Sequence, residues 1–352
     1  MVCNRSEYSF ASTEEIFKQK WVELLGYLFY FMVGVLTLGG SFVVMVVIAL
    51  NRTLHSRNYI LLAALAGADF IVGIQFVVGA IRRSTIILMG QYSLKVSPLT
   101  CLLETGNVPC YLFGAPCSIL VIAVISIDKL RAVRAVRRYS LLSGTSSYVA
   151  LATSYCVSIL ILVGASGSSY AIRNTSVNII CLTAHSVHRN FNMVFGLVQI
   201  AAGTVSICCY CSAYITVKCR FRKTSVFMVF PQWQRERARQ EIVLMKNLAI
   251  IIVATFVLTT IPNVVLLRLS YEDIEACWID KALPYVYLLI GSNSCINVFV
   301  YARKYPQFRE GLVIVLRRYC CLSNLKTEIE YINLRHLRGR TLSVETLWRD
   351  GH

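Results

Sequence analysis

Seven stretches of apolar residues constrain this chain more than any other feature of its sequence. An α-helix rises about 1.5 Å per residue, so about 20 apolar residues cover the roughly 30 Å hydrocarbon core of a bilayer. Each stretch reaches that length. The sequence therefore predicts an all-α membrane protein, a seven-transmembrane helix bundle, with spans at Leu24–Leu50, Tyr59–Ile81, Leu102–Ile127, Tyr148–Ile172, Asn192–Val217, Ile242–Leu267 and Ala282–Ala302.

The composition agrees with a membrane protein that has no large soluble domain. Hydrophobic residues make up 56% of the chain and charged residues only 15%, whereas a soluble domain carries about 25% charged residues. We therefore divide the chain into an extracellular head at 1–23, the transmembrane domain at 24–302, a short amphipathic eighth helix at 303–321 and a cytoplasmic tail at 322–352.

The distribution of the net charge of +17 predicts the orientation. Cytoplasmic loops of membrane proteins carry excess Lys and Arg. With the amino terminus outside, the inside loops and tail hold 25 of the 35 basic residues. This favours a multi-pass plasma-membrane protein with a cytoplasmic carboxyl terminus, in contact with anionic membrane lipid or an acidic partner and not with nucleic acid. Arg82, Arg83 and Lys95 run against this rule, because they fall in the first outside loop.

Two pairs of residues are candidates for covalent modification. Asn4 and Asn174 each begin an Asn-x-Ser/Thr triplet in a segment placed outside, so both are predicted glycosylation sites. Cys320 and Cys321 follow a basic segment after the last span, where palmitoylation is common; the alternative is two free thiols.

Four of the fourteen cysteines can reach the oxidising exterior. They are Cys3, Cys101, Cys181 and Cys277. The favoured disulfide joins Cys101, near the outer end of span three, to Cys181 in the second outside loop. Cys3 with Cys277 is the second pairing considered.

Polar residues inside the spans are costly in lipid, so they direct attention to function. Asp69 lies in the middle of span two, and the same depth offers Ser118 in span three and Asn293, Ser294 and Asn297 in span seven. Such an oxygen-rich cluster around one carboxylate suits a hard cation such as Na⁺. The alternative is a water-filled polar network that only packs the helices. No other cofactor is expected.

Four motifs follow one another in the spans at a fitting spacing. They are Leu65-Ala-Gly-Ala-Asp69, Ser126-Ile-Asp128-Lys129-Leu130-Arg131-Ala132-Val133, Phe256-Val-Leu-Thr-Thr260-Ile-Pro262, and Asn297-Val-Phe-Val-Tyr301 with Phe308 after it. Together they resemble the motifs of rhodopsin-like (class A) G-protein-coupled receptors. The resemblance covers nearly all of 24–318, and the variant motifs look most like nematode serpentine chemoreceptors of the srsx type.

The resemblance assigns the G-protein switch to Asp128, Lys129, Pro262 and Tyr301. Lys129 stands where the family has Arg, which keeps the charge but loses the planar five-donor fork. Its ionic contact with Asp128 and its reach into a G protein are therefore expected to be weaker than those of an Arg. Pro262 removes a helix hydrogen bond, so it predicts a kink that serves as a hinge or as a static bend. Cys101 lies three residues earlier than the family's spacing to Lys129 implies.

The resemblance also limits the ligand. The aspartate that amine receptors use in span three maps onto Tyr111, and the lysine that holds retinal maps near Gly291. Tyr111, Asn263 and Tyr287 remain as predicted ligand-binding residues of an outer pocket. The alternative for each of them is helix packing.

We therefore expect a cell-surface chemosensory receptor that is not an enzyme. It would bind an extracellular small organic or peptide ligand and act on a heterotrimeric G protein, with arrestin as a further partner that the resemblance allows. The alternative is an ion- or proton-coupled transporter that uses Asp69 as its carrier site. Against it, the sequence shows no inverted repeat and no second deep acidic residue.

Overall fold

The computed structural model describes residues 13–91, 94–134, 145–223, 245–246, 248–271 and 277–319. Within these ranges, seven helices are long and apolar enough to cross a membrane, which confirms the predicted bundle of a multi-pass membrane protein. The spans are Trp21–Leu50, Arg57–Leu88, Asn107–Arg134, Ser147–Ala171, Arg189–Cys219, Leu248–Arg268 and Tyr285–Lys304.

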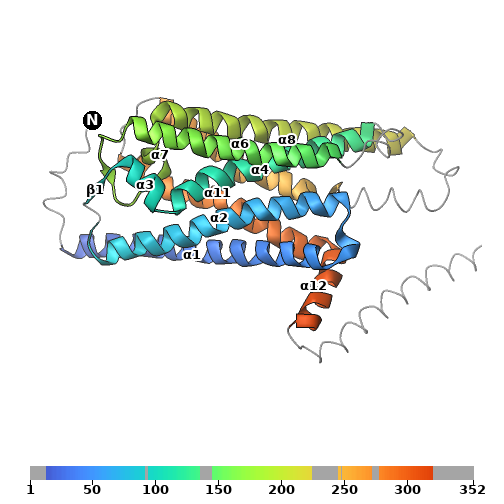
Figure 1. The fold of residues 1–352 in the computed structure, drawn as a ribbon, viewed down its shortest axis with the longest axis horizontal. Coiled ribbons are helices and arrows are strands. Elements are labelled where there is room, and N and C mark those ends of the chain that lie inside the picture. Colours follow the sequence, from blue (N-terminus) through green and yellow to red (C-terminus); the bar gives the residue numbers. More distant parts are fainter. Residues whose placement is uncertain are drawn as a thin grey trace, which may run out of the picture.

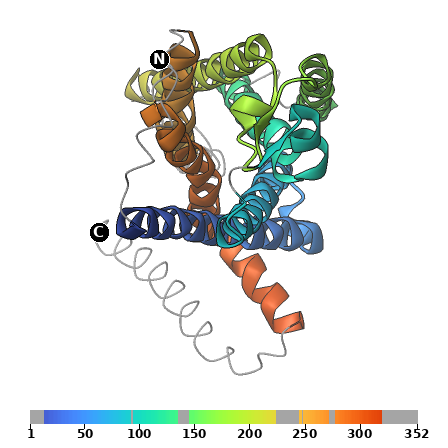
Figure 2. The ribbon, with the colours of Figure 1, turned by 90° about the vertical axis from the view of Figure 1, so that its left-hand side faces the viewer.

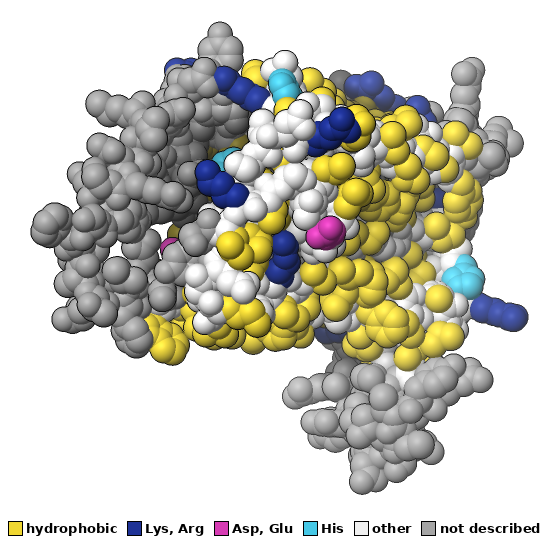
Figure 3. Space-filling view, turned by 60° about the vertical axis from the view of Figure 1, so that its left-hand side comes forward, with side chains coloured by type: hydrophobic (Ala, Val, Ile, Leu, Met, Phe, Trp, Pro, Cys, Tyr) yellow, Lys and Arg dark blue, Asp and Glu magenta, His cyan; other side chains and the backbone are white. Residues whose placement is uncertain are grey.

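The long helices run along one common direction (Figure 1). Large apolar side chains stay exposed on their outer faces, such as Trp21, Phe29 and Phe42 on the first helix, and Figure 3 shows a flank covered by hydrophobic side chains. Lipid would cover this flank. The helices are α1 (Thr13–Leu50), α2 (Arg57–Leu88), α4 (Asn107–Arg134), α6 (Thr145–Ala171), α8 (Arg189–Lys223), α10 (Ile261–Tyr271) and α11 (Cys277–Lys304).

Short elements close one end of the bundle, on the left of Figure 1. They are β1 (Lys95–Val96), α3 (Pro98–Glu104), β2 (Val177–Asn178) and α7 (Thr183–Ser186). The two strands pair antiparallel, with Val96 opposite Val177. We call this end, which carries the disulfide described below, the disulfide end.

The opposite end carries the short helix η2 (Arg52–Leu54) and α12 (Pro306–Tyr319). α12 leaves the direction of the bundle and projects to its side (Figures 1 and 2). Phe308 anchors it, since this ring is buried while Arg309 and Glu310 stay exposed. We call this the α12 end.

The second and third spans differ from the predicted ranges. α2 continues to Leu88, past the predicted end at Ile81, so Arg82 and Arg83 lie on a helix and not in a loop. Span three begins at Asn107 and not at Leu102. The pattern of apolar residues could not show this, because α3 is apolar as well.

A tight break separates α3 from α4. Gly106 adopts φ +65°, a left-handed conformation that favours glycine, and the hydroxyl of Thr105 donates to the carbonyl of Cys101 at 2.6 Å. Ser97 caps the start of α3 by accepting from the backbone N–H of Thr100. Cys101 therefore lies on a separate short helix, which explains its displacement from the family spacing.

The core has two hydrophobic clusters, one toward each end. The cluster at the disulfide end contains Phe76, Tyr111 and Tyr287, and the cluster at the α12 end contains Leu65 and Tyr301. Buried polar residues occupy the sequence positions between them on four spans. We call this set the polar layer: Asp69, Ser118, Thr255, Asn293, Ser294 and Asn297.

Span six changes its helix type just before Pro262. The five residues of η4 (Phe256–Thr260) form a π-helical turn, and the N–H of Ile261 donates to the carbonyl of Phe256, five residues earlier. Proline has no N–H, so the regular ladder cannot continue through Pro262, and a π-turn absorbs the mismatch. The irregularity predicted at Pro262 thus takes the form of a widened turn.

Candidate functional site

Asp69 lies at the centre of the polar layer and is fully buried. Its Oδ1 accepts hydrogen bonds from the hydroxyls of Ser118 (2.8 Å) and Ser294 (2.7 Å). Its Oδ2 accepts one from the side-chain amide of Asn297 at 2.8 Å. Buried polar groups are normally satisfied in this way, and here one carboxylate joins α2, α4 and α11.

Asn293 extends the polar layer to span six. Its Oδ1 accepts a hydrogen bond from the hydroxyl of Thr255 at 3.0 Å. Asn293 therefore joins span seven to span six and does not bond to Asp69. Thr255 precedes the π-turn directly. Spans two, three, six and seven are therefore connected by side-chain hydrogen bonds at one depth.

The polar layer offers a set of oxygen atoms that fits a hard cation. Asp69, Ser118, Ser294 and Asn297 converge, and the Oδ1 of Asn297 is buried with no hydrogen-bond partner in the described part of the chain. Oxygen ligands with a single carboxylate suit Na⁺ better than a transition metal. Within the described ranges, no three His, Cys, Asp or Glu side chains converge as a metal site.

A small cavity lies against the polar layer on its disulfide side. Its volume of about 20 Å³ has room for about one water molecule. Ser118, Thr255, Asn293 and Ser294 form its polar wall, and the remaining lining residues include Val72, Phe76, Tyr111, Ala115, Ile119, Thr259, Ile290 and Gly291. The residues that join the spans are thus the residues that a molecule in this cavity would contact.

The three predicted ligand-binding residues lie on the disulfide side of the bundle core. Tyr111 lines the cavity and packs edge-to-face on Tyr287, with ring centroids 5.2 Å apart. Asn263 donates to the side-chain oxygen of Gln199 at 3.0 Å and to the carbonyl of Thr259 at 2.8 Å. Tyr287 and Asn263 are buried but do not line the cavity, so only Tyr111 has direct access to it in this structure.

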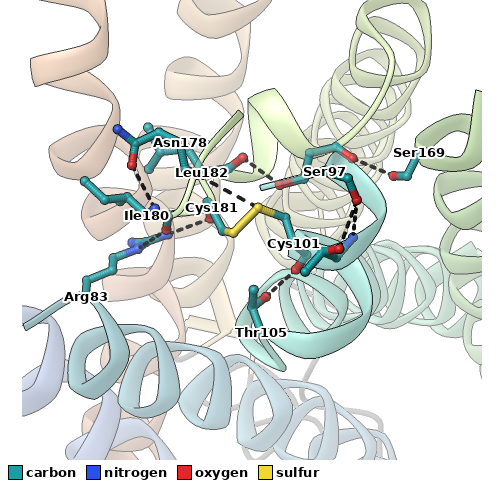
Figure 4. The surroundings of a disulfide bond; sticks show 11 residues. Arg83, Ser97, Cys101, Thr105, Ser169, Asn178, Ile180, Cys181 and Leu182 are labelled. Carbon is teal, nitrogen blue, oxygen red and sulfur yellow. Dashed lines mark hydrogen bonds between the residues drawn. A yellow bond between two sulfur atoms is a disulfide. The ribbon is translucent and has the colours of Figure 1, made fainter. Parts of the chain in front are cut away.

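A disulfide joins Cys101 on α3 to Cys181 in the loop before α7 (Figure 4). Cys181 adopts φ +53°, and its N–H donates to the carbonyl of Asn178 at 3.0 Å. The loop directs two carbonyls at Arg83, whose guanidinium donates to Ile180 at 3.3 Å and to Cys181 at 3.4 Å. Asn174, a predicted glycosylation site, is exposed in this loop.

At the α12 end, Asp128 binds a residue that the sequence did not single out. Its carboxylate forms an ion pair with Arg57 at the start of α2 and accepts from the hydroxyl of Ser147 on α6 at 3.0 Å. Lys129 is only 3% exposed and donates to the side chain of Asn58 at 2.8 Å. Both motif residues thus attach α4 to the start of α2.

Tyr301 is buried in the hydrophobic cluster at the α12 end. Its ring packs edge-to-face on Tyr305 with centroids 5.9 Å apart, and its hydroxyl has no hydrogen-bond partner among the described residues. Tyr305 lies between α11 and α12 and packs on Tyr59 of α2. An unsatisfied buried hydroxyl at a helix junction is available for a new bond after a rearrangement.

The comparison with protein families decides the class of this protein. Residues 40–301 match the model of the seven-transmembrane receptors of the rhodopsin family. The chain belongs to that family. It is therefore a receptor and not an enzyme, and the rhodopsin-family fold implies an extracellular ligand and a G protein as partners.

Similar curated proteins are receptors too. The chain is 27% identical to human lysophosphatidic acid receptor 3 over 282 residues, which cover 79% of the chain and 74% of the relative. It is 26% identical to the mouse receptor of the same name over 283 residues, again 79% of the chain and 74% of the relative. These relatives give no support to the srsx subfamily, which stays a prediction.

Sequence reasoning missed Arg57, Thr255 and Gln199 as partners of the predicted residues. The sequence around these residues does not mark them, because each acquires its role from a contact between spans. The sequence did mark Arg83, since a basic residue in an outside loop runs against the charge rule. Three further candidates, Asn4, Cys320 and Cys321, lie outside the described residues.

Proposed function

We propose that this rhodopsin-family receptor lies in the plasma membrane with its disulfide end outside and its α12 end in the cytoplasm. It binds an extracellular small organic or peptide ligand, with a chemosensory role, and activates a heterotrimeric G protein; arrestin then acts at the same end. The basic inside loops and the exposed Asn174 in the disulfide loop support this orientation.

One observation carries the proposal: the polar wall of the cavity consists of side chains whose hydrogen bonds connect the spans. Ser118, Thr255 and Asn293 all line the cavity and all bond within the polar layer. The cavity as it stands holds about one water molecule, so a larger ligand enters it only when these bonds are rearranged, and such a ligand therefore favours the rearranged state. Span six then moves about the π-turn at Pro262 and opens the α12 end near Lys129 and Tyr301.

We also propose that Na⁺ occupies the polar layer in the resting state. Asp69 would supply the negative charge, and Ser118, Ser294 and Asn297 would supply further oxygen ligands. Asn293 would keep span six next to this site through its hydrogen bond with Thr255. The unpartnered Oδ1 of Asn297 supports this assignment. The ion would leave when the ligand rearranges the layer.

The relatives suggest the first class of ligand to test. They are named as receptors for lysophosphatidic acid, an acidic amphiphile, although the identity is only 26–27%. The transporter interpretation has no observation in its favour, since the chain belongs to a family of receptors.

Ligand-dependent nucleotide exchange on a panel of Gα subunits tests the function. Membranes with verified surface expression receive pooled amphiphiles, small organic compounds and peptides. Lys129→Ala is compared with Arg131→Ala, a change of an exposed basic residue two positions further on. We expect exchange in the wild type that Lys129→Ala loses at least tenfold and Arg131→Ala largely keeps. Solute uptake without any nucleotide exchange would contradict the proposal.

A further inference from the structure

Arg83 is a buried cation whose guanidinium donates to neutral carbonyl groups. Its residue is only 4% exposed, near the disulfide end of α2. Its guanidinium donates to the carbonyls of Ile180 and Cys181 at 3.3 and 3.4 Å, and these carbonyls carry no net charge. In the part of the chain that the structure describes, Arg83 forms no ion pair with a carboxylate. Burying a charge under these conditions is costly, so a protein retains such a group where it has a use.

The aromatic rings around Arg83 hold the guanidinium in place but do not neutralise it. Its central carbon lies 5.8 Å from the ring centroid of Tyr27 and 5.9 Å from that of Tyr30. Cation–π contacts orient an arginine and leave its planar fork of donors for a carboxylate or phosphate. The two long carbonyl contacts are weak enough for an anion to replace.

A second, independent observation lies on the neighbouring residue. The Nη1 of Arg82 is buried and has no hydrogen-bond partner among the residues that the structure describes. The carboxylate of Glu104, which is exposed to solvent, interacts electrostatically with Arg82. The charges of Arg82 and Arg83, which are consecutive on α2, interact with each other, and Figure 3 shows further Lys and Arg side chains on the face around the disulfide end.

A row of packed aromatic side chains connects Arg83 to the wall of the cavity. Tyr30 packs under the guanidinium and against the ring of Phe76, with ring centroids 4.9 Å apart. Phe76 in turn lines the cavity beside Val72 and Ile290. A ligand with an acidic head and an apolar body would match this order of surfaces, with its head at the arginines and its body on the aromatic rings.

We infer that Arg83, with Arg82 beside it, binds the anionic head group of an amphipathic ligand, either a phosphate monoester or a carboxylate. The disulfide loop positions the site, because Cys181 both anchors the loop to α3 and presents a carbonyl to Arg83. The inference rests on the proposed receptor function and its orientation, since the site must face the exterior.

Direct binding tests the inference without any G protein. Purified receptor in nanodiscs of phosphatidylcholine alone is titrated with four compounds: a one-chain glycerolipid with a phosphate monoester, a fatty acid with the same chain, the neutral monoacylglycerol with that chain, and glycerol 3-phosphate. The first two distinguish phosphate from carboxylate, and the last tests whether a free phosphate suffices. We expect at least one acidic lipid to bind ten times or more tighter than the neutral lipid, and glycerol 3-phosphate to bind weakly.

The variants assign this preference to Arg83. Arg83→Gln should lose at least tenfold in affinity for the acidic lipid and keep its affinity for the neutral lipid, which also verifies that it folds. Arg83→Lys should be intermediate, because it keeps the charge without the fork. The matched control is Arg173→Gln, an exposed arginine at the same end that stacks on Tyr170 with its central carbon 4.2 Å from the ring centroid.

Equal binding of acidic and neutral lipids would overturn the inference, as would full acidic-lipid affinity in Arg83→Gln. If that variant does not fold, Arg83→Lys and the loss of wild-type affinity with rising salt decide the question. Nucleotide exchange in response to a neutral or cationic ligand, unchanged in Arg83→Lys, would refute the anion site and leave the receptor function standing. Arg83-dependent binding without any exchange would refute the receptor function and leave the anion site standing.

Discussion

Arg57 forms an ion pair with Asp128 and so joins the first turn of α2 to the Asp128-Lys129 motif of α4. Asp128 is 3% exposed, and Arg57 is its cationic partner. Removing the guanidinium would leave a buried carboxylate with weaker compensation, which costs about 1–2 kcal/mol for a pair with one partly exposed member. If the pair holds the resting state, Arg57→Gln should raise ligand-independent nucleotide exchange about five- to thirtyfold.

Arg52→Gln is the matched control, since Arg52 is an exposed arginine five residues earlier at the same end. Basal exchange is measured at equal surface expression for both variants. A rise in both, or in neither, would show that the Arg57–Asp128 pair does not restrain activation.

The sodium assignment predicts the effect of changing Asp69. Asp69→Asn keeps the shape of the side chain but removes its charge, so a cation loses its main ligand. Agonist affinity is measured in NaCl and in KCl at equal ionic strength, and we expect the difference between the salts to disappear in the variant. Ser118→Ala should reduce that difference without abolishing it. A sodium effect of wild-type size in Asp69→Asn would contradict the assignment.

Gly291 on α11 and Phe76 on α2 form a close contact that limits residue 291 to glycine. A Cβ at 291 would overlap the ring of Phe76. Gly291→Ala should therefore lower stability by about 1–3 kcal/mol, because overpacking displaces side chains that line the cavity. Thermal unfolding in detergent measures the loss as a lower melting temperature.

Phe76→Leu removes the ring and provides the test of mechanism. The double variant Gly291→Ala/Phe76→Leu should recover part of the stability lost in Gly291→Ala, so the effects of the two changes on stability are not additive. Strict additivity would show that the destabilisation does not come from this contact.

The disulfide predicts that replacing a bonded cysteine lowers stability more than replacing a free one. Cys101 and Cys181 close a loop with a sequence separation of 80, for which chain entropy suggests a contribution of roughly 4 kcal/mol. Cys101→Ser and Cys181→Ser should each lower surface expression and melting temperature, whereas Cys156→Ser, which removes an exposed free thiol, should change little. Two extra thiols that react with maleimide after reduction identify the bond. Wild-type stability of Cys101→Ser would show that the loop is held by other contacts.

The sequence alone determined the class of this protein. Length and apolar composition required seven spans, because lipid tolerates only long apolar helices at these positions. The cost of a carboxylate in lipid also made Asp69 the centre of attention, and Ser118, Ser294 and Asn297 were found at fitting depth from their sequence positions alone. Helix periodicity is a local property, and these predictions use nothing else.

Only the tertiary structure decided how the spans are joined. Asn293 binds Thr255 and not Asp69, Asp128 binds Arg57, and span three starts after a break at Gly106. Each of these depends on the rotation and height of one helix against another, which packing sets and which no local pattern records. For the same reason, the sequence showed only that Arg83 broke a charge rule, whereas the fold showed that this arginine is buried without a carboxylate among the described residues.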